Sequence, residues 1–200
     1  MIALRVLAPY AGARPKPREG ARCELCDAPL GDVHRHVAEL TTGAHGVKCA
    51  CHACAILFAA GTRFRTIPDR VRRDREFALD AAAWAQLGVP VALAFFVRSA
   101  GTTRVGYPGA AGVVDGELDE TVWTAVAGAT PLARELADDV EALLVRGARG
   151  AHKLACYLVP VTRAYELAGA LRESWRGFSG GDDAHARIAG FFATLDREAR

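Results

Sequence analysis

Two C-x-x-C pairs near the start of the chain constrain its fold more than any other feature. The first pair is Cys23 and Cys26, the second is Cys51 and Cys54, and 24 residues separate them. Each spacing lets a tight turn direct two sulfur atoms at one ion, and together the pairs form the four-cysteine donor set of structural zinc sites. Because five of the six cysteines lie within residues 23–54, a chance set of buried thiols explains the pattern poorly. The sequence therefore predicts a metal site at these four residues.

The residues between the two pairs predict a treble-clef-like order. Residues 34–40 alternate between polar and apolar, residues 41–43 (Thr-Thr-Gly) indicate a turn, and residues 46–50 suit a returning strand. Cys51 and Cys54 then open a short apolar helix, whose free backbone N–H groups favour thiolates. A knuckle, a hairpin and two ligands in a first helical turn are typical of treble-clef zinc fingers. We expect zinc at this site, with iron in a rubredoxin-like site as the alternative, because thiolates suit both metals.

Four further side chains near the pairs are additional or alternative ligands: Cys49, His34, His36 and His52. Cys49 lies two residues before Cys51 and would replace it, pack as a free thiol or act as a reactive thiol. His34 and His36 would share one face of a strand and could form a ligand pair. Since structural zinc closes at four ligands, we expect the histidines beside the metal or on the surface.

The chain divides into four segments by composition. Residues 1–22 read as a flexible basic arm, residues 23–61 as the four-cysteine metal-binding module, residues 62–77 as a basic connector and residues 78–200 as an α+β domain. The connector holds six arginines, but its own acidic residues favour ion pairs over an exposed basic patch.

The last segment mixes helical and strand patterns. Apolar runs predict strands at 89–97, 104–107, 141–146 and 152–159, and helical patterns cover 78–87, 120–127, the residues after Thr130, 162–177 and the C-terminal stretch. We expect an α+β fold with a mainly antiparallel sheet, four strands in two pairs and helices on one face. The glycine-rich stretch 108–117 carries neither a phosphate-binding nor a dinucleotide motif, and we expect a loop there.

Charge, hydropathy and motifs bear on three questions: whether the protein binds nucleic acid, crosses a membrane or catalyses a reaction. Residues 1–75 carry 13 Lys and Arg against 7 Asp and Glu, whereas residues 76–200 carry 12 against 16. This mild asymmetry permits a nucleic-acid partner without requiring one. Lacking a long apolar run and a secretory signal, the chain is expected to have no membrane span and to be cytoplasmic. It is expected not to be an enzyme, because hydrolase and metalloprotease motifs are absent and a four-cysteine site has no open position.

A series of motifs along the chain resembles an uncharacterised bacterial family that is often encoded beside uptake nickel–iron hydrogenase genes. The motifs are C-E-L-C, H-R-H, C-A-C-H-A-C-A-I-L-F, W-A-Q-L-G-V-P-V-A-L-A-F-F, D-V-E-A-L-L-V and W-R-G-F-S-G-G. The resemblance runs from Cys23 to the C-terminal helix, and residues 107–117 depart from it. It implies a role in making, assembling or serving a hydrogenase, with no catalytic residues to carry over. The family's cysteine motifs match Cys23, Cys26, Cys49, Cys51 and Cys54.

Three hypotheses follow. The first is a non-enzymatic, metal-binding accessory protein that contacts a protein partner, such as a hydrogenase subunit or maturation factor. The second is a nucleic-acid-binding regulator that uses Arg72 and Arg73 of the connector. The third is an electron-transfer or redox-sensing protein, with iron at the four-cysteine site or Cys49 as its reactive thiol.

Overall fold

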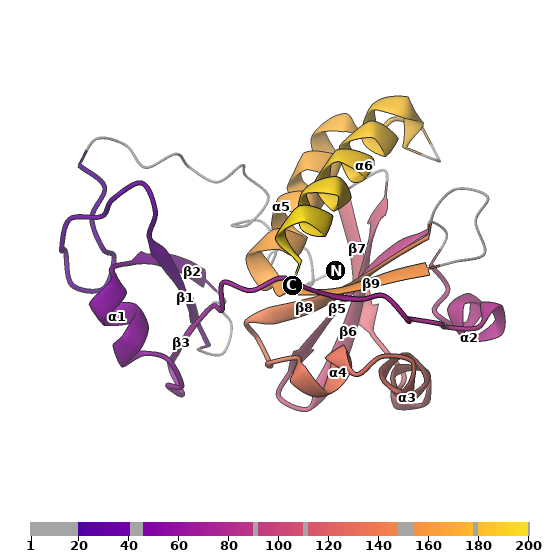
Figure 1. Cartoon of the computed structure of the whole chain (residues 1–200), viewed down its shortest axis with the longest axis horizontal. Coiled ribbons are helices and arrows are strands. Elements are labelled where there is room, and N and C mark those ends of the chain that lie inside the picture. Colours follow the sequence, from indigo (N-terminus) through magenta and orange to yellow (C-terminus); the bar gives the residue numbers. More distant parts are fainter. Residues whose placement is uncertain are drawn as a thin grey trace.

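Two antiparallel sheets organise the chain into a small lobe and a larger one (Figure 1). The computed structural model describes residues 20–40, 46–89, 92–109, 112–147, 154–177 and 180–199. Almost all of the predicted N-terminal arm, and the predicted turn at 41–43, lie outside the described residues. The predicted α+β class, with antiparallel pairing and a cysteine cluster near the N-terminus, is confirmed.

The small lobe is a three-stranded sheet in the order β2-β1-β3 with one short helix. Val37 and Ala50 are fully buried and pack with Cys23 and Cys54, so the cysteine cluster is also the centre of this lobe's core. The predicted hairpin and the helix that follows it are confirmed. The elements are β1 (Arg35–Glu39), β2 (Gly46–Ala50), α1 (His52–Leu57) and β3 (Phe64–Thr66).

The large lobe is built on a six-stranded sheet in which all neighbouring strands are antiparallel. In place of the four strands expected, residues 72–74 of the connector add an edge strand, and most of the stretch expected to be a glycine-rich loop pairs at the other edge. These edges pair through backbone groups, which leave little pattern in the side chains. In spatial order the strands are β4 (Arg72–Asp74), β9 (Leu154–Pro160), β8 (Glu141–Gly147), β5 (Leu93–Ser99), β6 (Thr102–Gly109) and β7 (Gly112–Glu117).

Helices cover both faces of this sheet, so the expectation of helices on one face is wrong. Phe96 packs with Trp123 on one side, whereas its neighbour Phe95 packs with Leu171 and Phe192 on the other. Successive strand residues point to opposite faces, and the continuous apolar runs of β5 and β8 therefore need a cover on each side. The first face carries α2 (Ala81–Gln86), α3 (Glu120–Gly128) and α4 (Leu132–Glu135), and the second carries α5 (Val161–Ser174) and α6 (Gly181–Glu198).

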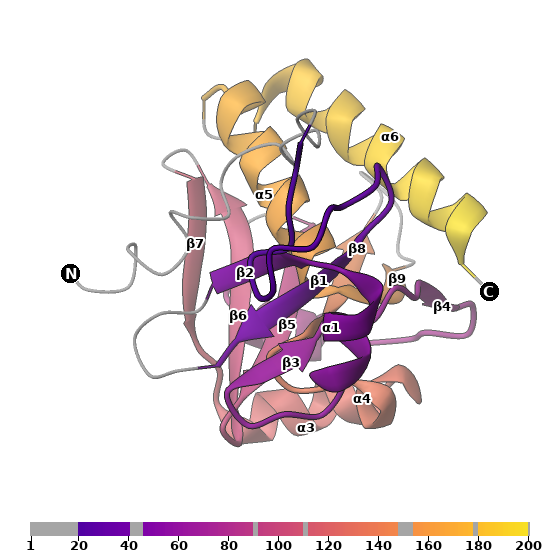
Figure 2. The same ribbon diagram turned by 90° about the vertical axis from the view of Figure 1, so that its left-hand side faces the viewer.

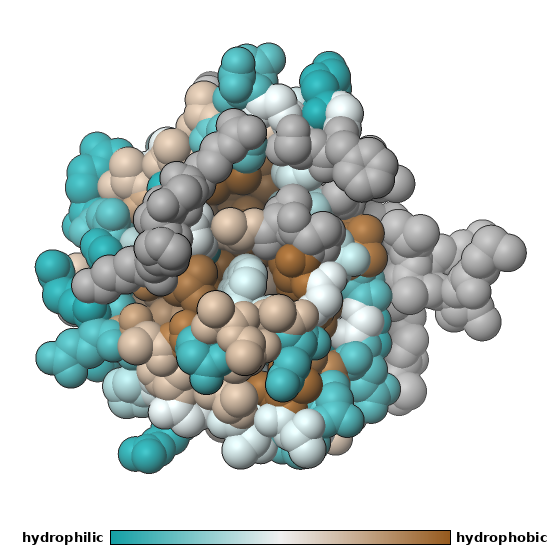
Figure 3. Space-filling model, turned by 90° about the vertical axis from the view of Figure 1, so that its right-hand side faces the viewer, coloured by the Kyte–Doolittle hydropathy of each residue, from teal (hydrophilic) through white to brown (hydrophobic). Residues whose placement is uncertain are grey.

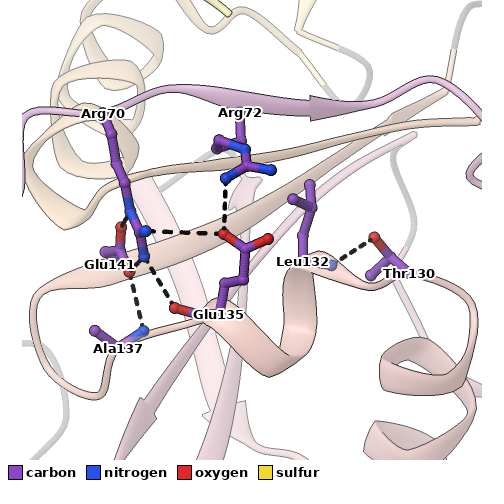
Figure 4. A network of polar contacts seen from close by, with 7 residues as sticks. All are labelled: Arg70, Arg72, Thr130, Leu132, Glu135, Ala137 and Glu141. Carbon is purple, nitrogen blue, oxygen red and sulfur yellow. Dashed lines mark hydrogen bonds and ion pairs between the residues drawn. The ribbon is translucent and has the colours of Figure 1, made fainter. Parts of the chain in front are cut away.

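An ion pair with a buried carboxylate fastens the connector to the large lobe. Glu141, which is fully buried at the start of β8, accepts hydrogen bonds from Arg70 Nε at 2.7 Å and Arg70 Nη2 at 2.8 Å. Its Oε2 also accepts the backbone N–H of Ala137 at 3.0 Å (Figure 4). Hydrogen bonding to Glu141 raises the pKa of the Arg70 guanidinium. Two of the three hydrogen bonds described here to this carboxylate thus come from the connector.

Apolar side chains complete the junction between the lobes. Ala38 of β1 and Ile67 of the connector pack with Val140 and Val161 of the large lobe, and all four are buried. The face of the small sheet that carries Ala38 is therefore turned toward the large lobe, and α1 lies on the outer side (Figures 1 and 2).

The exposed surface is mixed in character. The face at the α2 end of the molecule shows hydrophobic side chains between hydrophilic ones (Figure 3). Among the described residues, the large hydrophobic side chains that are exposed are Val33, Ile56, Leu57 and Val114. Within the same residues, no helix combines the length and the apolar character that crossing a membrane requires.

Candidate metal centre

The structure brings the four predicted cysteines together. The Sγ atoms of Cys23, Cys26, Cys51 and Cys54 all lie within 4.8 Å of one another, and those of Cys26 and Cys51 are 3.6 Å apart. A tetrahedral zinc ion with Zn–S bonds of about 2.3 Å places its sulfur ligands about 3.8 Å apart. All six cysteines are free thiols, so no disulfide competes for these sulfurs. The donor set and its spacing therefore fit an ion held by four cysteines, and thiolate ligation suits zinc as well as iron.

A tight turn positions the first pair. Cys23 donates its N–H to Ala28 at 2.7 Å, and Asp27 donates its N–H back to Cys23 at 2.8 Å. Asp27 takes a positive φ of 62°, a conformation that Asp tolerates better than most residues. The turn closes on itself and aims both sulfurs of the pair to the same side.

The start of α1 positions the second pair. Cys51 is the N-cap residue, and its Sγ accepts the N–H of Cys54 at 3.5 Å. Cys54 lies in the first turn and is buried beneath the helix. A sulfur atom thus takes the capping role that Ser or Asp usually fills, which ties the helix boundary to the cysteine cluster.

Hydrogen bonds within the cluster shift the pKa values of Cys23 and Cys54 in opposite directions. Burial alone would raise the pKa of the Cys23 thiol, but backbone hydrogen bonds from Cys51, Leu25 and Cys26 outweigh burial and lower the pKa to about 6. The hydrogen bond to Cys26, followed by burial, raises the pKa of Cys54 to about 12. One thiolate forms readily, and the crowded neighbours then resist a second negative charge. A bound dication would remove this conflict, because a coordinated thiol is deprotonated outright.

The other predicted ligands separate from this cluster. His34, His36 and Cys49 form a second group, whose ligand atoms also lie within 4.8 Å of one another. His52, the first residue of α1, is exposed and belongs to neither group. It lines a hollow of about 320 Å³ together with His34 and Cys51.

Glu24 was not among the residues predicted for the site. It donates its N–H to the carbonyl of Cys49 at 3.0 Å, and its carboxylate accepts the N–H of Cys49. This residue therefore fastens the first cysteine turn to β2. The signal that the sequence offered for Glu24 was its position inside the first C-x-x-C pair.

Arg72 and Arg73 of the connector are engaged in ion pairs. Arg72 Nη1 lies 3.1 Å from Glu135 Oε2, and Arg73 Nη1 lies 2.7 Å from Asp196 Oδ1. These partners belong to the large lobe, not to the connector as expected. The arginines on which the nucleic-acid hypothesis depends thus already have protein counter-charges.

The fold and the sulfur cluster define a two-lobed α+β protein whose small lobe carries a cluster of four cysteines that could hold a metal ion. The chain belongs to a family of unknown function, DUF5947, which matches residues 22–199. The match covers both lobes, as the resemblance in the motifs implied, and it brings no activity with it. No curated protein and no solved structure matches the chain.

Proposed function

We propose that this protein is a zinc-binding accessory protein whose small lobe docks on another protein. The observation that carries the proposal is the two-sided character of α1. This helix turns Cys54 inward to the sulfur cluster, and it leaves Ile56 and Leu57 64% and 74% exposed. The metal would therefore hold in place a short apolar ridge that no described part of the chain covers.

The distribution of exposed apolar side chains supports docking through the small lobe. Val33, at 95% exposure, lies in the same lobe as Ile56 and Leu57, and Val114 alone among the described residues of this kind belongs to the large lobe. Exposed hydrophobic residues that gather on one region mark interaction sites, whereas single ones are ordinary. The proposed role needs no reaction at the four-cysteine centre, since four protein ligands close the coordination sphere.

For the partner we propose a nickel–iron hydrogenase subunit or one of its maturation factors. This part rests on the resemblance of the motifs to a family often encoded beside hydrogenase genes. A cytoplasmic setting, in which clustered cysteines stay reduced, would suit the role.

The metal is tested first. We expect one firmly held zinc in the four-cysteine centre, lost in Cys23→Ser together with the folded structure of the small lobe. Elemental analysis and circular dichroism of the two proteins measure this. A folded wild-type protein without metal would overturn the proposal, and a coloured, iron-containing protein would favour the redox hypothesis.

The partner is tested by co-production with each hydrogenase subunit and maturation factor from the same source. We expect the wild-type chain and the control Val114→Asp to co-purify with one of them. The variant Ile56→Asp/Leu57→Asp, which leaves all cysteines intact, should lose the partner. If none is retained, the hydrogenase role fails, and salt-sensitive nucleic-acid binding lost in Arg72→Ala/Arg73→Ala would favour a regulator instead.

A further inference from the structure

The hairpin of the small lobe brings a second set of ligands together. His36 and Cys49 are direct partners in the register of β1 and β2. Side chains of such a pair lie on the same face with Cβ atoms about 5 Å apart. His34 precedes His36 by two residues, and their rings lie 4.9 Å apart between centroids. One ligand atom from each of the three residues lies within 4.8 Å of the others.

His34 is arranged as metal-binding histidines are. Its Nδ1 lies 3.3 Å from the backbone carbonyl of Gly31, and a carbonyl can only accept, so Nδ1 carries the proton. In the neutral imidazole, Nε2 is then the nitrogen with the lone pair. It is shielded from solvent and has no hydrogen-bond partner within the described part of the chain. A histidine that binds a metal through one nitrogen commonly donates the other N–H to a backbone carbonyl. A bound ion would satisfy the orphaned Nε2.

The backbone that carries the cluster is already held in place. The N–H and the carbonyl of Cys49 are both bonded to Glu24, as described above. The carbonyl of His36 accepts the N–H of Ile67, which fixes β1 from its other side. A site built on paired strands keeps its ligands close to the binding geometry before the ion arrives.

The second group is distinct from the four-cysteine centre. Val37 and Ala50 alternate with His36 and Cys49 along the strands, and they pack in the core that contains Cys23 and Cys54. Since neighbouring strand residues point to opposite faces, His36 and Cys49 point away from that core. Their face is the one on which Ala38 packs against the large lobe.

We propose that His34, His36 and Cys49 form a second metal site, which takes a transition-metal ion of borderline softness such as Zn²⁺. Two imidazoles and one thiolate are the ligand types that such ions prefer. Three protein ligands are one fewer than a tetrahedral ion needs, so a water molecule or another external ligand completes the sphere. Two neutral imidazoles and one thiolate leave a dication with net positive charge, which favours an anionic fourth ligand. A hollow lined by His34 borders the group.

This site does not depend on the docking role proposed above, because a protein that meets no hydrogenase partner would still hold two metals. The test uses the full chain, loaded with excess Co²⁺ under reducing conditions and freed of unbound metal by desalting. We expect two cobalt ions per chain, and one in His34→Ala/His36→Ala. His52→Ala, which alters the same hollow but not the cluster, should keep two.

Cys49→Ala separates the site from a general loss of structure. It should hold one cobalt ion, keep the wild-type circular dichroism, and lose about one fifth of the thiolate-to-cobalt absorption, since one of five Co–S bonds disappears. The double histidine variant should keep the absorption of the four-cysteine centre. One cobalt ion in the wild-type chain, or two in Cys49→Ala, would overturn the proposal. So would loss of the four-cysteine absorption in Cys49→Ala, because Cys49 would then belong to the first centre.

Discussion

The buried carboxylate of Glu141 predicts an asymmetry between the two halves of one ion pair. Its side chain is 0% exposed, whereas that of its partner Arg70 is 42% exposed. Three hydrogen bonds to the Glu141 carboxylate are described above. Arg70→Met removes two of them, and it also removes the positive charge that faces the carboxylate. Glu141→Gln removes the buried charge, and Arg70 keeps solvent and the neighbouring Glu135 carboxylate at 3.8 Å. The arginine variant should therefore be the less stable of the two.

The magnitudes follow from burial. An uncompensated buried charge costs about 3–5 kcal/mol, so Arg70→Met should lose about 4 kcal/mol of unfolding free energy. Glu141→Gln weakens hydrogen bonds without stranding a charge and should lose about 1–2 kcal/mol. In the double variant Arg70→Met/Glu141→Gln no carboxylate is stranded, and it should be more stable than Arg70→Met alone.

Urea unfolding followed by tryptophan fluorescence measures the difference. The chain's three tryptophans, Trp84, Trp123 and Trp175, all belong to the large lobe and report on the sheet that holds Glu141. With a slope of about 2 kcal/mol per molar urea, Arg70→Met should lower the midpoint by about 2 M.

Arg163→Met is the matched control. Arg163 holds Glu198 at 2.7 and 2.8 Å, as closely as Arg70 holds Glu141, but the Glu198 side chain is 37% exposed. Water can replace that arginine, so the loss should stay below about 1 kcal/mol. Equal losses in Arg70→Met and Arg163→Met, or a larger loss in Glu141→Gln than in Arg70→Met, would refute the reasoning from burial.

Three further predictions concern packing, pH and metal. Gly106→Ala would place a methyl group 2.3 Å from the ring of Phe95 and should lose about 1–3 kcal/mol in the same urea assay, whereas Gly116→Ala, which meets nothing within 4 Å, should lose less. Burial, and then the hydrogen bond to Asp196, raises the pKa of Tyr157 to about 12. Folding thus favours the neutral phenol, and its stabilisation holds below pH ~10 and is lost as pH rises toward 12. The melting temperature of Tyr157→Phe should fall less steeply with pH across that window than the melting temperature of the wild type. Equal slopes would contradict the assignment. Removal of metal by a chelator should unfold the small lobe and leave the tryptophan signal largely unchanged, whereas loss of both together would show that the lobes unfold as one unit.

The amino-acid sequence by itself determined the local parts of this protein. The C-x-x-C spacing, the alternation that marks β1, and the apolar run after Cys51 are short-range patterns, and each leads to the structure found. The continuous apolar run of β5 predicted a buried strand, because every residue of such a strand meets a core. Short-range patterns of this kind predict the secondary structure of a segment and which of its side chains are buried.

Strand pairing and ion pairs between residues far apart in the sequence were decided only by the tertiary structure. Residues 72–74 and 112–117 became edge strands because backbone groups of β9 and β6 were free to pair with them, which side-chain patterns do not record. The structural role of Arg70 depends on its ion pair with Glu141, which lies 71 positions further along the chain. The alternation along β1 and β2 also separated His36 and Cys49 from the core around the four metal-site cysteines. It thereby divided one cysteine- and histidine-rich stretch into two groups of side chains that could hold a metal ion.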